Sequence, residues 1–267
     1  MTAVPLTAGW TYAVWKVRMV GEAYNAVIPA FGMGGEPIKA ILLRRHHRLG
    51  YRDIAAGFIL SKTMILVTLV PFVLVGLALA WPAEILGTDE IRGVLVGLAI
   101  IAFVAAAVLI GPSLRLSARA GVAMRRLRIG RASRRLFHRV ARMERQLVDF
   151  YATRKRRCLG AAAFAFLHWV ICTVEVYCVF WFLGIPLSFG EVWIVEAATQ
   201  FVRAATFFIP ASLGAQEGVI ILVCTALTGS PTTGVAVAVV RRLREIFWIL
   251  WGMFLGTRYA GTAATAG

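Results

Sequence analysis

The stretch TFFIPASLGAQEG, residues 206–218, places a proline, a glycine and a glutamate inside an apolar part of the chain. A second stretch, NAVIPAFGMGGEP at residues 25–37, shares its Ile-Pro-Ala and a later glutamate. Pro29 aligns with Pro210 and Glu36 with Glu217, both at an offset of 181 residues. Proline removes a backbone donor and breaks a helix, and glycine permits a tight reversal. The two stretches therefore predict two related broken helices.

The composition indicates that these breaks lie in a membrane. The chain has 267 residues, is 60% hydrophobic and has a mean hydropathy of +0.77. Four apolar segments are each near the ~20 residues that cross a bilayer core: 54–81, 91–112, 158–184 and 233–256. We expect an all-α polytopic membrane protein whose residues 1–267 form a single transmembrane domain. The first residues contain no apolar run of signal-peptide length, so no cleavable signal is predicted.

Basic residues predict how the chain is oriented. Residues 115–157 hold 15 of the 29 Lys and Arg, against only two acidic residues, and the loop 44–52 is also strongly basic. The positive-inside rule places this loop and the basic segment 113–157 in the cytoplasm. The segments 10–43 and 189–229, which carry the breaks, then dip into the membrane from opposite faces as an inverted pair of re-entrant segments. This arrangement accounts for the net charge of +16 better than nucleic-acid binding does.

The basic segment contains one apolar stripe at helical spacing, formed by Leu136, Val140, Met143, Leu147 and Phe150. An amphipathic basic helix of this kind lies on the cytoplasmic leaflet and contacts anionic headgroups. The alternative is a loop helix that packs on the protein's own cytoplasmic base.

The broken segments also carry charged and polar residues at membrane depth. Each charge near the bilayer centre costs about 2.5–3.5 kcal/mol on insertion scales, so such groups pair, face water or bind a ligand. A helix that restarts after a break aims free amides at the same depth, which suits a phosphate or carboxylate. The candidate substrate-binding residues are Glu22, Asn25, Pro29, Glu36, Arg203, Pro210, Gln216, Glu217, Arg241, Arg244 and Glu245.

Ion pairs are expected among these charges. Glu217 is expected to pair with Arg203 or with an arginine of the last span, and Glu245 with Arg241 or Arg242. Two alternatives stay open. In one, the charges only lock the broken segments together. In the other, residues 215–240 cross the membrane as one broken helix, which places the RRLR sequence at 241–244 at the cytoplasmic interface.

No motif for catalysis is present in the sequence. It contains no nucleotide-binding loop, no HExxH and no acidic metal pair, and its four cysteines form no CxxC pair. We therefore predict no metal, no cofactor and no catalytic residue, and a translocase rather than an enzyme.

Three stretches together resemble a known family: GEAYNAVIPAFGMGGEPIKAILLRR at 21–45, EAATQFVRAATFFIPASLGAQEG at 196–218 and RRLREIFWILWG at 241–252. They are similar to the lysylphosphatidylglycerol synthase transmembrane (flippase-like) superfamily, and within it to the hopanoid-biosynthesis-associated integral membrane branch. The resemblance covers about residues 10–257. It implies movement of lipids between leaflets of the bacterial cytoplasmic (inner) membrane, without the synthase domain that some members carry. It also implies further spans ahead of the first motif, where this chain has some 20 residues.

These observations predict a lipid translocase for a polar or anionic lipid, hopanoid-related lipids included. The two half-helix ends, with Arg203, Arg241 and Arg244, are expected to hold the headgroup near the midplane. Glu36 and Glu217 are expected to tune that site or carry protons. Expected partners are membrane lipids and lipid-biosynthesis proteins, with no nucleic acid. The alternatives are an accessory subunit or membrane enzyme of lipid or hopanoid assembly, and a re-entrant-loop transporter similar to the DedA proteins.

Overall fold

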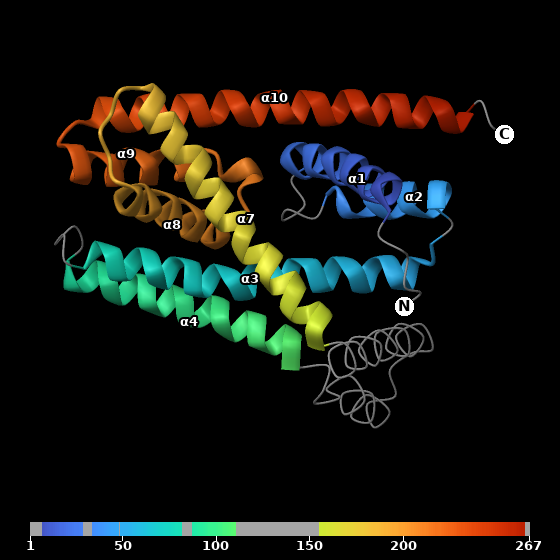
Figure 1. Cartoon of the computed structure of the whole chain (residues 1–267), viewed down its shortest axis with the longest axis horizontal. Helices are drawn as coiled ribbons and strands as arrows, with labels where there is room; N and C mark the ends of the chain where they lie inside the picture. Colours follow the sequence, from blue (N-terminus) through green and yellow to red (C-terminus); the bar gives the residue numbers. More distant parts are fainter. Residues whose placement is uncertain (1–6, 29–33, 48, 82–86, 111–154, 265–267) are drawn as a thin grey trace, which may run out of the picture. The chain divides into compact units, whose positions relative to one another are not determined.

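The computed structural model describes residues 7–28, 34–47, 49–81, 87–110 and 155–264, and every regular element among them is a helix (Figure 1). The break at Pro29 and the apolar stripe of the basic segment lie outside these residues. The elements are α1 (Ala8–Val27), α2 (Glu36–His47), α3 (Tyr51–Ala80), α4 (Thr88–Ile110), α7 (Lys155–Phe182), α8 (Phe189–Ala205), the 3-10 helix η1 (Pro210–Ser212), α9 (Ala215–Thr228) and α10 (Pro231–Ala264). The predicted all-α class is confirmed.

Four stretches of the described chain are long and apolar enough to cross a membrane: Asp53–Ala80, Ile91–Val108, Arg156–Phe182 and Pro210–Thr228. The first three coincide with predicted spans. The fourth lies inside the predicted re-entrant segment 189–229, whereas α10, which contains the predicted span 233–256, is not among the four. The re-entrant geometry and the opposite orientation of the two broken segments therefore stay predictions.

The helix boundaries repeat along the chain. Helices α8, α9 and α10 begin 181, 179 and 180 residues after α1, α2 and α3. Each set contains a helix, a shorter helix and a long helix, with lengths of 20, 12 and 30 residues in the first set and 17, 14 and 34 in the second. The offset first seen in the two short motifs thus extends over three successive helices.

The chain divides into two compact units, which are described separately. The first unit contains residues 52–72 of α3, helix α4 and residues 155–170 of α7. Here Trp169 Nε1 donates a hydrogen bond to Thr68 Oγ1 at 3.1 Å, and the Trp169 ring stacks on Phe72 with centroids 5.8 Å apart. An indole that both packs and donates in this way joins α3 to α7 within this unit.

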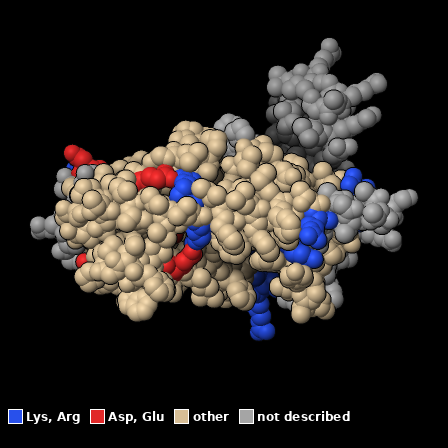
Figure 2. Space-filling model, turned by 90° about the horizontal axis from the view of Figure 1, so that it is seen from above, with Lys and Arg blue, Asp and Glu red and all other residues tan. Residues whose placement is uncertain are grey.

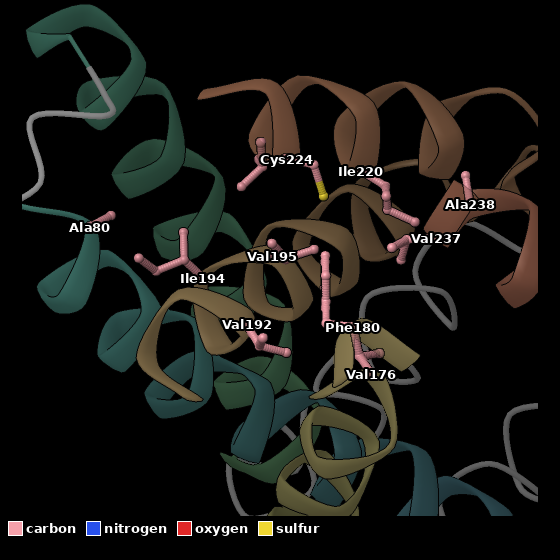
Figure 3. Packing of buried hydrophobic residues seen from close by; sticks show 11 residues of the cluster. Ala80, Val176, Phe180, Val192, Ile194, Val195, Ile220, Cys224, Val237 and Ala238 are labelled. Atoms are coloured by element: carbon pink, nitrogen blue, oxygen red, sulfur yellow. The ribbon is translucent and has the colours of Figure 1, made fainter. Parts of the chain in front are cut away.

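The second unit contains α1, α2, the last turns of α3, the C-terminal part of α7, and α8 to α10. Small residues let its helices approach closely: a Cβ added at Gly234 of α10 would lie 2.5 Å from Ile221 Cα of α9. The core of this unit consists of Ala80, Val176, Phe180, Val192, Ile194, Val195, Ile220, Val223, Cys224, Val237 and Ala238 (Figure 3). This packing fixes α8, α9 and the start of α10 around the second break.

Helix α1 packs along α10 through two glycines of α10. A Cβ at Gly252 would lie 2.6 Å from the Met19 carbonyl oxygen and 2.7 Å from Ala23 Cβ, and one at Gly256 would lie 3.3 Å from Val20 Cγ1. Helix α1 also contacts η1. The helix that precedes the first break therefore lies against both the second break and the last helix.

Candidate functional site

Polar groups cluster on both sides of the first break. The Gly35 amide donates to Asn25 Oδ1 at 2.7 Å, so a side chain of α1 caps the start of α2. Asn25 Nδ2 also donates to Glu22 Oε2 at 3.3 Å. Lys39 Nζ lies 2.7 Å from Glu22 Oε1 and 3.1 Å from Glu36 Oε1, and the lysine side chain is only 7% exposed. One buried lysine thus bridges two carboxylates, one from each side of the break.

Two glycines make this arrangement possible. A Cβ at Gly21 would lie 2.1 Å from Lys39 Cε, and a Cβ at Gly35 would lie 1.8 Å from the Gly21 carbonyl oxygen. Both distances are under the 3.0 Å that real Cβ contacts respect. Gly21 and Gly35 are therefore needed for the close approach of α1 and α2, in addition to any reversal of the chain between them.

The second break is a sharp turn between α8 and α9. Ala211 and Ser212 have φ values of 50° and 47°, and Gly214 has a φ of 82°. The first two are unusual for residues with a Cβ and carry a conformational cost. Gln216 Nε2 donates to the Ala211 carbonyl at 3.2 Å, and the Gln216 and Ser212 side chains are buried. The predicted break at Pro210 is thus present, as the first residue of η1.

Glu217 occupies the start of the helix that follows this turn. Its Oε2 accepts a hydrogen bond from the Gly214 amide at 2.8 Å, while its Oε1 pairs with Arg242 of α10. The predicted pairing of Glu217 with an arginine of the last span is confirmed. A carboxylate at a helix N-terminus is favourable, since it meets unpaired amides and the positive end of the dipole. The protein itself thus supplies an anion at the helix start where the sequence predicted a ligand.

Three arginines within one turn of α10, at positions 241, 242 and 244, pair with carboxylates on three different helices. Arg241 Nη1 lies 2.5 Å from Glu196 Oε2 on α8, and the two side chains are 9% and 1% exposed. Gln200 Nε2 donates to the other oxygen of Glu196 at 2.6 Å, so this buried carboxylate has two partners. Arg244 pairs with Glu175 on α7.

The remaining contacts join Arg203, Arg242, Glu217 and Glu245 into a third group beside the Arg241–Glu196 and Arg244–Glu175 pairs, and the three groups form one set on α7 to α10. Arg242 Nη1 lies 2.7 Å from Glu245 Oε2, as the spacing predicted, and Arg203 Nη1 of α8 lies 3.9 Å from Glu245 Oε1. We call this set the arginine–glutamate network: Arg203, Arg241, Arg242, Arg244, Glu175, Glu196, Glu217 and Glu245. Four guanidinium groups face four carboxylates, so the formal charge of the network is zero.

The structure differs from the predicted headgroup-binding site in one respect. Arg203, Arg241 and Arg244 were expected to hold a headgroup, and each has a carboxylate partner within the protein. Glu22, Asn25 and Glu36 lie in the first cluster instead. The predicted site omitted four members of these clusters, although each is an ionised residue inside an apolar stretch: Lys39, Glu175, Glu196 and Arg242.

Comparison with known proteins identifies the family. Residues 8–252 match the family described as Lysylphosphatidylglycerol synthase TM region. The chain belongs to this family. It is also 25% identical over 257 residues to a UPF0104 membrane protein of Methanothermobacter thermautotrophicus, an alignment that covers 90% of this chain and 72% of the relative. No solved structure matches the chain.

Membership of the lysylphosphatidylglycerol synthase TM region family makes the chain an integral membrane protein, in agreement with its apolar helices. The matched residues 8–252 include both breaks, the first cluster and the whole arginine–glutamate network. The match does not extend to the hopanoid branch or to a bacterial inner membrane, which stay predictions.

Proposed function

We propose that this family member moves a lipid with a polar headgroup between the two leaflets of its membrane. The observation that carries the proposal is the arginine–glutamate network, in which four helices, two of them on either side of the second break, contribute paired charged side chains. Ionised groups at membrane depth are expensive and mark substrate or ion pathways by default. Ion pairs are also a weak way to stabilise a fold, because apolar replacements of similar volume are often as stable.

The arrangement supports alternating access. Broken helices with a binding site between repeats are the pattern of secondary transporters, in which one repeat rocks against the other. A headgroup that enters the network exchanges with an internal partner, because its own charges replace those of an arginine or a glutamate. The lipid tails remain in the bilayer. When the site opens to the other side of the membrane, Glu217 binds or releases a proton, or it pairs with a different arginine. We propose no covalent step, so the protein acts as a translocase and not as an enzyme.

Reconstitution in proteoliposomes tests this function. Purified protein is placed in vesicles that contain a fluorescently labelled lipid. A membrane-impermeant reductant then quenches the label only where the lipid lies in the outer leaflet. We expect the unmodified protein to expose inner-leaflet lipid to the reductant, and Arg203→Ala and Arg241→Ala to slow this at least about tenfold. Arg92→Ala is the matched control, since the Arg92 side chain is 79% exposed and pairs with Asp89 outside the network. Failure of the unmodified protein to move the lipid would rule the function out, and equal rates for all four proteins would rule out a role of the network in it.

Lipids that copurify with the protein define the substrate. The detergent-purified protein should retain lipids of one headgroup class, which native mass spectrometry identifies. The two classes to compare are polar phospholipids and hopanoid-derived lipids. Conversion of labelled lipid precursors into a new product by the same preparation would instead favour a membrane enzyme of lipid assembly.

A further inference from the structure

We infer that Glu175 and Arg244 form a lateral recognition site, on the lipid-facing side of α7 and α10, for a headgroup that carries both a phosphate and an amine. The inference rests on the proposed movement of lipids and specifies which lipids enter. It is carried by the exposure of this pair, by the apolar surface around it and by its balance of charge.

The pair differs from its neighbours in exposure. Arg241 and Glu196 are sealed, whereas the Arg244 and Glu175 side chains are 35% and 41% exposed. Both partners of this pair are thus within reach of a group outside the protein. Figure 2 shows basic and acidic side chains next to each other on one face, with uncharged surface between them and further charged groups on the same face.

The surface around the pair is suited to acyl chains. Val174, which precedes Glu175, and Leu243, which precedes Arg244, are 44% and 62% exposed. Further exposed apolar side chains follow on both helices: Tyr177, Trp181, Ile246, Phe247 and Trp248. A half-exposed ion pair in such surroundings is costly unless polar groups cover it. A lipid headgroup covers it while its chains lie along the apolar side chains of α7 and α10.

The charges of the pair select the headgroup. Arg244 uses one Nη group on Glu175, and its Nε is buried, so the second Nη group of the guanidinium keeps the donors for a phosphate. Glu175 keeps lone pairs for an ammonium group. A headgroup with only a phosphate would face the carboxylate with like charge, and one with only an amine would face the arginine. A headgroup with both groups satisfies both side chains without breaking a pair.

Within the arginine–glutamate network, the Glu175–Arg244 pair lies close to the sealed Arg241–Glu196 pair. Arg244 lies three residues after Arg241 on α10, which is one helical turn along the same side. A headgroup on Glu175 and Arg244 is therefore one turn away from the buried Arg241–Glu196 pair. This places the lateral site where a lipid from the bilayer first meets the network.

Headgroup preference tests the site, with binding measured separately from movement. Phosphatidylethanolamine, which has a phosphate and an amine, and phosphatidylglycerol, which has only the phosphate, are titrated at equal acyl composition against the full chain in detergent by native mass spectrometry. We expect the unmodified protein to prefer phosphatidylethanolamine, and Glu175→Gln to lower that preference at least about tenfold. Asp89→Asn, which removes an exposed carboxylate outside the network, should leave the preference unchanged.

The outcomes separate the site from the proposed function. An unchanged preference in Glu175→Gln overturns the site, even if vesicle assays show movement of lipids. A lost preference in a protein that moves no lipid supports the site and rejects the translocase. A change in oligomeric mass in Glu175→Gln without any change in preference shows that a second copy of the chain covers the pair, and also overturns the inference. Arg244→Lys keeps the charge and serves as a second variant if Glu175→Gln does not fold.

Discussion

At the scale of single residues, Glu217 combines two tasks in one carboxylate. One oxygen accepts the Gly214 amide at the start of α9, and the other pairs with Arg242. The sequence presented this glutamate as an expensive charge near a break. Its position three residues after Gly214 shows that part of the cost is offset, since the group also satisfies a backbone donor that the break leaves open.

Two substitutions separate these tasks. Glu217→Gln keeps an oxygen for the Gly214 amide but loses the charge, whereas Glu217→Ala loses both contacts. We expect Glu217→Ala to be less stable than Glu217→Gln by about 1 kcal/mol, which is a usual value for a helix cap. Melting of the two variants in the same detergent measures the difference. Equal melting temperatures would show that the amide contact contributes nothing.

The choice of partner could not be predicted to the same degree. The sequence indicated that Glu217 meets Arg203 or an arginine of the last span, because few other cations lie at that depth. Successive residues of a helix point about 100° apart, so the choice among Arg241, Arg242 and Arg244 depends on the rotation of α10 about its axis. That rotation is fixed by packing against α8 and α9, and one sequence contains no direct record of it. The Arg241–Glu196 pair was missed for this reason.

Gly21 yields a second prediction at this scale. A Cβ there overlaps the Lys39 stem, whereas a Cβ at Gly9 in the same helix meets nothing within 4 Å. Both substitutions to alanine gain helix propensity, so their difference reports the local packing. We expect Gly21→Ala to destabilise the protein by about 1–3 kcal/mol relative to Gly9→Ala. Thermal unfolding measures it, and two equal shifts would mean that Lys39 moves aside without cost.

At the scale of elements, the contact between the ends of α1 and α2 introduces sensitivity to pH. The His47 ring meets Trp10 edge-on, with centroids 4.8 Å apart. The pKa of His47 is lowered from its usual 6.5, first by burial, then by His46 and by Lys16. The residue lies in the basic stretch predicted to be cytoplasmic. The folded protein therefore disfavours the protonated ring, which the unfolded chain accepts more readily.

The difference in His47 protonation between the folded and the unfolded chain sets the direction in which stability changes with pH. Because the unfolded chain binds more protons between the lowered pKa and 6.5, stability should fall as the pH drops below about 6.5 and level off below the folded pKa. His47→Gln should flatten the curve of melting temperature against pH in that window. Melting between about pH 7.5 and pH 5 tests this. If the two curves stay parallel, the ring does not titrate with folding.

At the scale of the whole molecule, the balance of charge in the arginine–glutamate network separates a structural role from a functional one. Removing one partner of the sealed Arg241–Glu196 pair leaves a buried charge and should cost about 3–5 kcal/mol. Removing both, in Arg241→Leu with Glu196→Leu, should restore most of the stability. If the charges only lock the broken segments together, the double variant also restores lipid movement. We expect a folded protein that moves lipid at least about tenfold more slowly.

At each of the two breaks, one cationic side chain bridges two carboxylates. The two breaks differ in how far apart along the chain the cation and its partners lie. Lys39 and both of its partners lie within α1 and α2, 3 and 17 residues apart. Arg242 reaches Glu217 from a helix that begins after α9 has ended, 25 residues away. A genetic selection should register this difference. Suppressors of a lesion at Glu36 are expected inside the α1–α2 hairpin, whereas suppressors of a lesion at Glu217 are expected on α10.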